Sequence, residues 1–209
     1  IRDNLVRNPY WARHGNRVEP MHIKKADAVV CNSDYYAEYA LLYNPLSFMV
    51  GQGCDTSMFE EEEKKIEVAK ELESLKHPVA GYIGYLTSRR LDIELLVNLA
   101  KEKKELTLVL VGPEDENFRV SELHALPNVV FTGSKPPEEL ASYLKAFDVA
   151  LNPQEVNEAT IGNYPRKIDE YLVMGKPVVA TYTKAMEYFR DVCYLAASAK
   201  DYPSLIEKA

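Results

Sequence analysis

The chain contains few histidines and cysteines, which limits the metal and redox chemistry that it can support. Among its 209 residues are four histidines, which are scattered along the sequence, and three cysteines, Cys31, Cys54 and Cys193. The cysteine count is odd, the spacing is wide and no Cys-x-x-Cys occurs, so neither a disulfide framework nor a zinc site is expected. Cys31 and Cys193 lie in apolar stretches and are expected to be buried thiols. These features fit a reducing compartment, and we expect the cytoplasm.

The chain also lacks an excess of basic residues and a long apolar run. Its net charge of −7 argues against a nucleic-acid partner, because nucleic-acid-binding proteins normally present a basic face. No apolar run approaches the roughly 18 residues of a membrane-spanning helix. The first residues, IRDNLVRN, include neither a start methionine nor the apolar core of a signal peptide. We therefore expect Ile1 not to be the natural start, and any membrane association of the full-length protein to be peripheral, at the inner face.

Short apolar runs alternate with segments of helical periodicity. The apolar runs predict strands at 28–31, 46–50, 79–83, 106–111, 129–131, 149–151, 177–181 and 193–195. Between them, the spacing of apolar residues predicts helices that include 120–126, 136–146, 165–175 and 185–189. Repeated strand–helix–strand units predict an α/β fold, with a Rossmann-like parallel sheet and helices on both faces. Ligands bind such sheets beyond the C-terminal ends of the strands.

One glycine pair after a strand does not complete a dinucleotide-binding motif. Gly51 and Gly53 follow the run 46–50, but the third glycine of the motif should stand at Thr56. No P-loop, zinc-protease, serine-hydrolase or kinase signature occurs in the sequence. We therefore look for function in two other groups of residues.

The first group follows the strand 79–83. Gly84 ends that run with a small residue, and Thr87, Ser88, Arg89 and Arg90 open the next helix. Exposed backbone donors, hydroxyl groups and guanidinium groups together make a good anion site. The alternative is a turn that carries two solvated arginines.

The second group opens the helix predicted from Pro165. Arg166 and Lys167 are followed by Glu170, and this spacing places them on one helical face. A cation at a helix start can hold a phosphate, and a carboxylate can accept hydrogen bonds from both hydroxyls of a vicinal diol. The alternative is a surface salt bridge, which is common and weak.

These groups combine into a resemblance to a known family. Residues 79–209 resemble the C-terminal domain of group 1 glycosyltransferases, which have the two-domain GT-B fold. The strongest match is the run FDVALNP at 147–153, followed by PRKIDEYLVMGKPVVAT at 165–181. Residues 25–33 resemble a segment near the end of the family's acceptor domain, and residues 50–59 resemble the crossing into the donor domain. The resemblance implies that residues 1–54 are the tail of the acceptor-binding domain with the linker, and that residues 55–209 bind the nucleotide sugar.

The resemblance also implies roles for particular residues. The donor diphosphate would be bound by Gly84, Arg89, Arg90 and Lys167, and the ribose by Glu170. The donor sugar and base would lie near Tyr85, Gly133, Lys135, Thr160, Ile161 and Gly162. The sequence departs from the family at two of these positions. Gly162 stands where many relatives have a glutamate, and Tyr85 stands where many have an arginine.

The leading interpretation is a glycosyltransferase that moves a hexosyl-type sugar from a UDP- or GDP-sugar to a glycan or lipid-linked acceptor, in cell-surface polysaccharide synthesis. No cofactor and no metal are expected, because Arg90 and Lys167 can neutralise the diphosphate. This stretch of chain is expected to be inactive alone, since the acceptor half would precede it. One alternative is a degenerate nucleotide-binding module. A less favoured alternative is a sugar-nucleotide epimerase.

Overall fold

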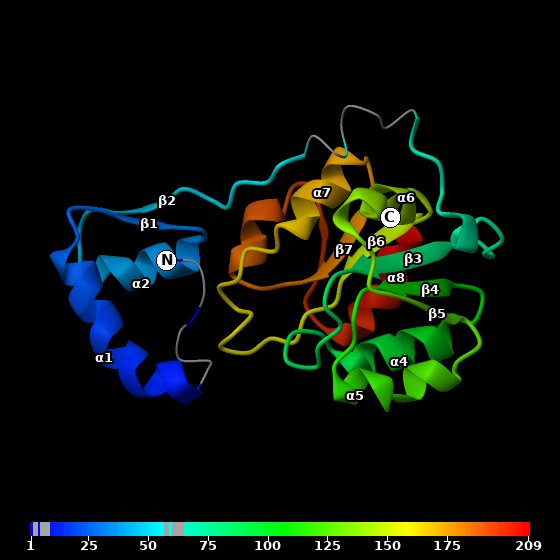
Figure 1. Cartoon of the computed structure of the whole chain (residues 1–209), viewed down its shortest axis with the longest axis horizontal. Coiled ribbons are helices and arrows are strands. Elements are labelled where there is room, and N and C mark those ends of the chain that lie inside the picture. Colours follow the sequence, from blue (N-terminus) through cyan, green and yellow to red (C-terminus); the bar gives the residue numbers. More distant parts are fainter. Residues whose placement is uncertain (2–3, 5–8, 57–58, 60–64) are drawn as a thin grey trace. The chain divides into compact units, whose positions relative to one another are not determined.

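The chain divides into two compact units in the computed structural model (Figure 1), which describes residues 1, 4, 9–56, 59 and 65–209. The first unit comprises residues 1–53, 156–165 and 183–188, and the second comprises residues 54–155, 166–182 and 189–209. The functional boundary predicted between residues 54 and 55 stays a prediction. Residues 57–58 of the segment that resembles the domain crossing lie outside the described residues.

The second unit is built on a six-stranded parallel sheet, as the sequence predicts. Its strands are β3 (Val79–Ile83), β4 (Thr107–Val111), β5 (Val129–Gly133), β6 (Val149–Asn152), β7 (Val178–Thr181) and β8 (Tyr194–Ala196). The order across the sheet is β5-β4-β3-β6-β7-β8, and every neighbouring pair is parallel. Strands β3, β4, β6 and β7 are buried along their whole length, which explains their continuous apolar runs. The chain runs outward from β3 to β5 and then returns to the other side of β3, so the strand order reverses between β3 and β6.

Helices cover both faces of this sheet (Figure 1). One face carries α6 (Leu140–Lys145) and α7 (Lys167–Val173), and the other carries α4 (Ile93–Glu102), α5 (Glu116–Arg119) and α8 (Tyr202–Lys208). Helix α4 begins after Asp92, whose side chain accepts a hydrogen bond from the Leu95 amide at 2.8 Å. Leu95, Leu96 and Leu99 of α4 are buried in the main apolar core. Five short 3₁₀ turns connect described elements: η3 (Lys70–Leu72), η4 (Glu122–Ala125), η5 (Pro137–Glu139), η6 (Ala185–Phe189) and η7 (Ala199–Asp201).

Four predicted helices differ in the structure. The segment 136–146, predicted as one helix, begins as the 3₁₀ turn η5 and continues as α6. The segment 120–126 forms only the turn η4, because the short helix α5 ends at Arg119 and the chain is extended at Ser121, the N-cap of η4. The segment 185–189 is the 3₁₀ turn η6. The helix expected from Pro165 begins at Lys167, and its N-cap is Arg166. Pro165 therefore precedes the cap instead of lying in the first turn.

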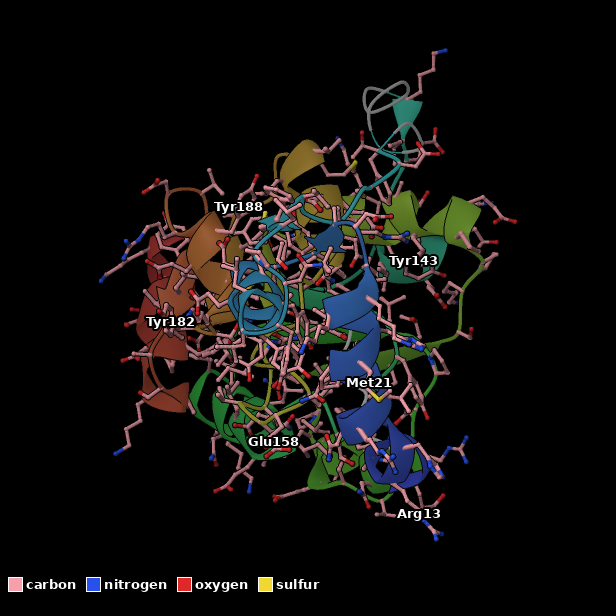
Figure 2. The ribbon with its side chains drawn as sticks, turned by 90° about the vertical axis from the view of Figure 1, so that its left-hand side faces the viewer. Arg13, Met21, Tyr143, Glu158, Tyr182 and Tyr188 are labelled. Carbon is pink, nitrogen blue, oxygen red and sulfur yellow. The ribbon has the colours of Figure 1, made fainter. Side chains whose placement is uncertain are left out.

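The first unit contains a small sheet with two helices. Its elements are α1 (Pro9–Lys25), β1 (Val29–Cys31), α2 (Asp34–Leu41) and β2 (Ser47–Met49), and β1 pairs with β2 in parallel. The core of this unit is formed by Ile23, Val29, Cys31, Tyr36, Ala37 and Ala40. Arg13 and Met21 mark the course of α1 in Figure 2. The predicted burial of the Cys31 and Cys193 thiols is confirmed.

Candidate functional site

Glycines lie at the C-terminal ends of three neighbouring strands in the second unit. Gly84, Gly112 and Gly133 follow or end β3, β4 and β5, and all three have positive φ angles of 145°, 143° and 71°. The Gly84 amide donates to the Val111 carbonyl at 2.8 Å, and the Gly112 amide donates to the Gly133 carbonyl at 2.9 Å. A Cβ atom on Gly112 would lie 1.9 Å from the Gly84 carbonyl oxygen. The strand ends therefore meet as bare backbone, which only glycine permits at this distance and in this conformation.

Lys167 brings a positive charge to this edge. A Cβ atom on Gly84 would lie only 3.2 Å from Lys167 Nζ, so the ammonium group rests against the backbone at the end of β3. Lys167 Nζ also donates to Tyr82 Oη at 2.9 Å and lies 4.4 Å from the centre of the Tyr82 ring. These contacts hold a flexible side chain in one place. The structure thus brings together two of the predicted diphosphate-binding residues, Gly84 and Lys167.

Tyr171 fixes α7 to the same strand end. Its hydroxyl oxygen accepts a hydrogen bond from the Ile83 amide at 2.9 Å. Burial, followed by the nearby Tyr82, raises the pKa of Tyr171 well above its ordinary value, so the hydroxyl is neutral. Lys167 and Tyr171 are one turn apart on α7. Lys167 contacts Tyr82 and Tyr171 contacts Ile83, which are the last two residues of β3.

Glu170 lies in the first turn of α7, beside Lys167. Its side chain is 16% exposed, and one carboxylate oxygen is 3.4 Å from Nη2 of Arg166, whose side chain is 54% exposed. Burial raises the pKa of the Glu170 carboxyl, against the opposing effects of Arg166 and Lys167. The surface salt bridge that the sequence left open as an alternative is therefore present, and the carboxylate is also partly withdrawn from water.

Asp115 holds the turn that carries Arg89 and Arg90. One oxygen of its carboxylate accepts hydrogen bonds from the Ser88 amide at 2.8 Å and the Ser88 hydroxyl at 3.0 Å, and the other accepts from the Phe118 amide at 3.0 Å. Burial alone would raise the pKa of Asp115, but these hydrogen bonds outweigh it and lower the pKa. Asp115 was missed at the sequence level, although its place as N-cap of α5, just after the Gly-Pro that ends β4, was a usable signal.

Tyr85 and Lys135 lie in the same unit, but Lys135 is engaged elsewhere. Tyr85 is 55% exposed next to Gly84. Lys135 Nζ lies 2.7 Å from a carboxylate oxygen of Glu71 and 5.0 Å from the centre of the Tyr143 ring, and the Tyr143 hydroxyl also donates to Glu71. Hydrogen bonding to Glu71 and Tyr143 raises the pKa of Lys135. Lys135 therefore connects the segment after β5 to η3, through Glu71, and to α6, through Tyr143.

The remaining predicted residues, Thr160, Ile161 and Gly162, belong to the first unit. Thr160 is buried and its hydroxyl oxygen accepts a hydrogen bond from the Asn157 amide at 3.0 Å. The carbonyl of Gly162 accepts from the Ser33 hydroxyl at 2.7 Å. A Cβ atom on Gly162 would lie 2.3 Å from Cδ1 of Tyr35. The tyrosine ring thus takes the space that a side chain at position 162 would need, which gives a physical reason for glycine there.

The described residues present neither a metal cluster nor a membrane-spanning helix. Among them, no group of three or more histidine, cysteine, aspartate or glutamate side chains is arranged to hold a metal ion. In the part of the chain that the structure describes, no helix has both the length and the apolarity needed to cross a bilayer.

The second unit is a parallel α/β sheet of a ligand-binding type, with the ammonium group of Lys167 against its glycine-lined carboxyl edge. Sequence comparison identifies the family. The sequence model of the family "Glycosyl transferases group 1" matches residues 77–209. The chain therefore belongs to the group 1 glycosyltransferases, and the resemblance noted from its motifs is confirmed.

Two curated relatives are similar over part of their length. A Bacillus subtilis protein named as a candidate teichuronic acid biosynthesis glycosyltransferase, TuaH, is 30% identical over 165 residues, which cover 76% of this chain and 41% of the relative. A GDP-mannose-dependent alpha-mannosyltransferase of Corynebacterium glutamicum is 26% identical over 133 residues, 63% of this chain and 30% of the relative. The chain thus spans less than half the length of these relatives.

Solved structures share the fold. The Anabaena protein Alr3699/HepE, crystallised with UDP and glucose, matches 98% of this chain and 59% of its own chain with a TM-score of 0.77 and 20% identity. A sucrose-phosphate synthase of Thermosynechococcus elongatus matches 97% of this chain and 52% of its own with a TM-score of 0.71 and 19% identity. These likenesses confirm the predicted Rossmann-like architecture of a GT-B glycosyltransferase.

Proposed function

We propose that the protein transfers a sugar from a nucleotide-diphosphate donor to a glycan or lipid-linked acceptor in cell-surface polysaccharide synthesis. Family membership supports the transferase class. The donor class is supported by relatives: one is named for GDP-mannose, and the Anabaena structure was solved with UDP-glucose. The name of the Bacillus relative, which refers to teichuronic acid, supports a cell-surface product. We further propose that the work is done in the cytoplasm, with peripheral association at the inner face of the membrane.

The contact between Lys167 and Gly84 is the single observation that carries the donor proposal. An ammonium group lies against bare backbone at the C-terminal end of β3, beside the place where the strand order reverses. Ligands of open α/β sheets bind at such reversal points. Because Gly84 has no side chain, the oxygens of a diphosphate can approach both the backbone and Lys167.

We propose that Arg89 and Arg90 contribute further positive charge to the donor site. The turn that carries them is joined to the segment after β4 by backbone hydrogen bonds, in which the Leu86 amide donates to the Pro113 carbonyl at 2.8 Å and the Asp115 amide donates to the Leu86 carbonyl at 2.9 Å. When the bond between the donor sugar and the diphosphate breaks, negative charge develops on the leaving nucleoside diphosphate. Fixed cations at that point stabilise the transition state without the cost of reorganising solvent.

We propose that Glu170 accepts hydrogen bonds from the ribose hydroxyls. Glu170 lies three residues after Lys167, on the same side of α7. A nucleotide whose phosphates contact Lys167 can therefore place its ribose near the carboxylate. A carboxylate has two oxygens, and each can accept from one hydroxyl of a vicinal diol. Tyr85 and Gly133 are proposed to lie near the donor base and sugar, as are Lys135 and the segment 160–162.

Calorimetric titration with UDP and GDP tests the proposal. Lys167→Gln removes the charge at the strand edge, and the affinity of the nucleotide that binds should fall roughly 10- to 100-fold, the value of one charged hydrogen bond. Lys200→Gln, at an exposed position in η7, is the matched control and should bind like the parent. If neither nucleotide binds the parent chain, the donor proposal fails. If both variants bind alike, Lys167 has no role in it.

Turnover by the full-length protein separates the transferase from its alternatives. A UDP- or GDP-sugar should be consumed only when an acceptor is present. Donor conversion without an acceptor would favour an epimerase, and nucleotide binding without any turnover would favour a degenerate binding module.

A further inference from the structure

The side chain of Asn152 is buried without a hydrogen-bonding partner. Asn152 ends β6, one of the two strands between which the order of the sheet reverses, and it is 0% exposed. Within the described part of the chain, neither its Nδ2 nor its Oδ1 atom has a partner. Gln154 is 5% exposed, and its Oε1 atom also lacks a partner among the described residues. Such an amide costs free energy, because it gives up its hydrogen bonds to water and gains none in return.

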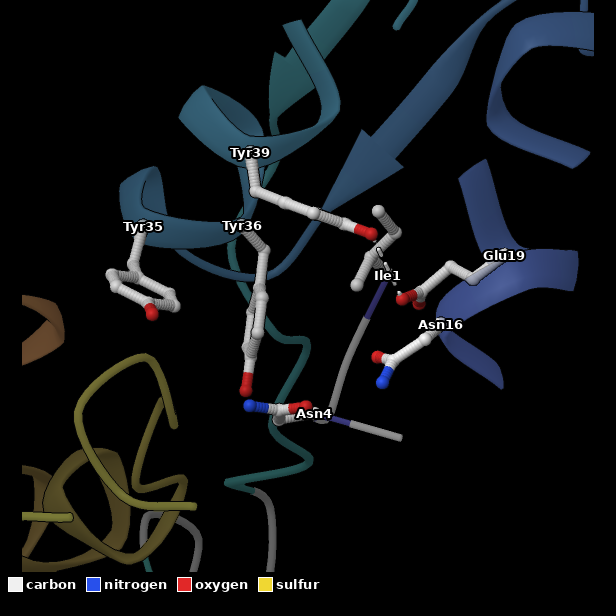
Figure 3. Close-up of a pocket in the computed structure, with 7 residues that line it drawn as sticks. All are labelled: Ile1, Asn4, Asn16, Glu19, Tyr35, Tyr36 and Tyr39. Atoms are coloured by element: carbon white, nitrogen blue, oxygen red, sulfur yellow. Dashed lines mark hydrogen bonds between the residues drawn. The ribbon is translucent and has the colours of Figure 1, made fainter. Parts of the chain in front are cut away.

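Other polar side chains of the same chain do make hydrogen bonds. Asn128 Nδ2 donates to three backbone carbonyl groups at 3.0, 3.2 and 2.9 Å, and Asn44 Nδ2 donates to two at 3.0 and 2.7 Å. The Tyr39 hydroxyl donates to Glu19 Oε2 at 3.4 Å (Figure 3). Buried polar groups in folded proteins are nearly always paired in this way, so the exception at Asn152 needs a physical reason.

Asn152 lies between two parts of the proposed donor site. Val149 and Leu151 of β6 belong to the core that α4, α5 and α8 cover. Side chains alternate along a strand, so Asn152 faces the side of the sheet that α6 and α7 cover (Figure 1). Helix α7 carries Lys167 and Glu170. The unpaired amide is therefore on the same side of the sheet as the lysine and the glutamate of the proposed site.

The backbone after Asn152 is joined to the turn that carries Arg90. The Asp92 amide donates to the Pro153 carbonyl at 3.0 Å, and the Glu155 amide donates to the Arg90 carbonyl at 2.9 Å. The segment that follows β6 is therefore bound to the arginine turn and moves with it. A displacement of either this turn or α7 changes the surroundings of the Asn152 amide.

Unmade hydrogen bonds raise the free energy of the arrangement that contains them, and a ligand shifts a protein toward the arrangement that it binds better. We propose that Asn152 is a positioning residue for the donor site. Its amide is unpaired in the nucleotide-free arrangement and gains partners when the diphosphate draws the arginine turn and Lys167 together. Gln154 acts in the same way through its one unpaired oxygen. This inference rests on the proposed donor function and adds a conformational step to it.

Two substitutions at Asn152 test the inference by stability and affinity together. Asn152→Leu and Asn152→Ala both remove the unpaired amide, one with a larger and one with a smaller side chain. The more stable of the two should melt ~2–8 °C above the parent, since a buried polar group without a partner is lost. Both should bind the nucleotide that the parent binds ~5- to 50-fold more weakly in calorimetric titration, because the nucleotide-free arrangement no longer carries the cost.

Asn128→Leu is the matched control, because it makes the same chemical change in an amide that donates to three carbonyl groups. It should melt below the parent and bind nucleotide like the parent. Opposite changes in melting temperature for the two asparagines distinguish an unpaired amide from a paired one.

NMR spectra that show side-chain NH₂ groups follow the amide directly. The pair of signals that is missing from Asn152→Leu belongs to Asn152. On titration with UDP or GDP this pair should move to lower field and saturate together with nucleotide binding, as expected when an amide begins to donate a hydrogen bond.

Three results would overturn the inference. They are melting of both Asn152 variants below the parent, nucleotide affinities equal to that of the parent, and Asn152 signals that stay in place at saturation. If neither Asn152 variant folds, Gln154→Met decides by the same two measurements of stability and affinity. A parent that binds neither UDP nor GDP would remove the donor proposal as well, whereas equal binding by the parent and the Asn152 variants would remove this inference alone.

Discussion

Glu170 offers the most direct test of the donor site, because Glu170→Gln keeps the shape of the side chain and removes its charge. In the folded chain the carboxylate is 16% exposed, and it forms an ion pair with Arg166 at 3.4 Å. If it accepts hydrogen bonds from ribose hydroxyls, losing a charged acceptor should weaken the nucleotide by roughly 1.5–3 kcal/mol, or 10- to 100-fold in affinity. Calorimetric titration of parent and variant with UDP and GDP measures this change.

The effect of the same substitution on stability should be small. Arg166 is 54% exposed, and a pair of this kind is worth less than about 1 kcal/mol. Folding also raises the pKa of Glu170 above its ordinary value of 4.5, because burial disfavours the charged form. The stability that this group contributes is therefore complete below about pH 4.5 and is lost as the pH rises through the folded-state pKa. Glu170→Gln has no such loss, so at neutral pH its free energy of unfolding should equal or exceed that of the parent.

Arg166→Gln is the control that separates the two roles of Glu170. It removes the ion pair and keeps the carboxylate, so nucleotide affinity should change by no more than ~5-fold. Equal affinities for the parent and Glu170→Gln, with a nucleotide that does bind, would refute the ribose role and leave Glu170 as half of a surface salt bridge.

Three further substitutions test the framework of the site. Asp115→Asn keeps an oxygen for the Phe118 amide but turns a donor toward Ser88, so nucleotide affinity should fall ~3- to 10-fold with a loss of about 1 kcal/mol in stability; unchanged affinity in calorimetry would show that this turn does not bind the donor. Gly112→Ala should lower the free energy of unfolding by more than ~2 kcal/mol in chemical denaturation, because its Cβ would lie 1.9 Å from a carbonyl oxygen at a φ of 143°. A loss below about 0.5 kcal/mol, the range of ordinary surface substitutions, would contradict the geometry. Lys176→Met removes the ammonium group that donates to the Lys145 and Phe147 carbonyls at 3.0 and 2.8 Å, so it should lower stability by about 1–3 kcal/mol and leave nucleotide affinity unchanged.

The parallel sheet could be predicted from the sequence because its central strands are buried on both faces. The runs at 79–83 and 106–111 are almost wholly apolar, and each residue of β3 and β4 is buried in the fold. Glycines at the ends of these runs indicate the edge at which ligands of such sheets generally bind. For Lys167 and Glu170 the signal was equally local, because helical spacing alone placed them together at the start of α7.

Contacts between distant segments could not be predicted in this way. Nothing near Lys135 indicates that Glu71 will pair with it, and nothing near Gly162 indicates that the ring of Tyr35 will lie against it. Helix ends were also misjudged where local rules compete. Pro165 suits a first helical turn, yet the helix begins after Arg166. The apolar residues around 120–126 predict one helix, although the chain is extended at Ser121.

The geometry of α7 explains why the most specific motif of the chain combines residues that bind with residues that only pack. Tyr171 accepts from the Ile83 amide, so it sets the position of the helix along β3. One turn earlier, the same register carries Lys167 to Gly84. After the helix ends, Lys176 ties the following loop to the C-terminal end of α6 through two carbonyl groups. A shift of α7 by one residue would rotate Lys167 by about 100° and take its charge away from the strand end. Tyr171, which packs α7 against the end of β3, is therefore as necessary to the proposed donor site as the lysine and the glutamate that would contact the nucleotide.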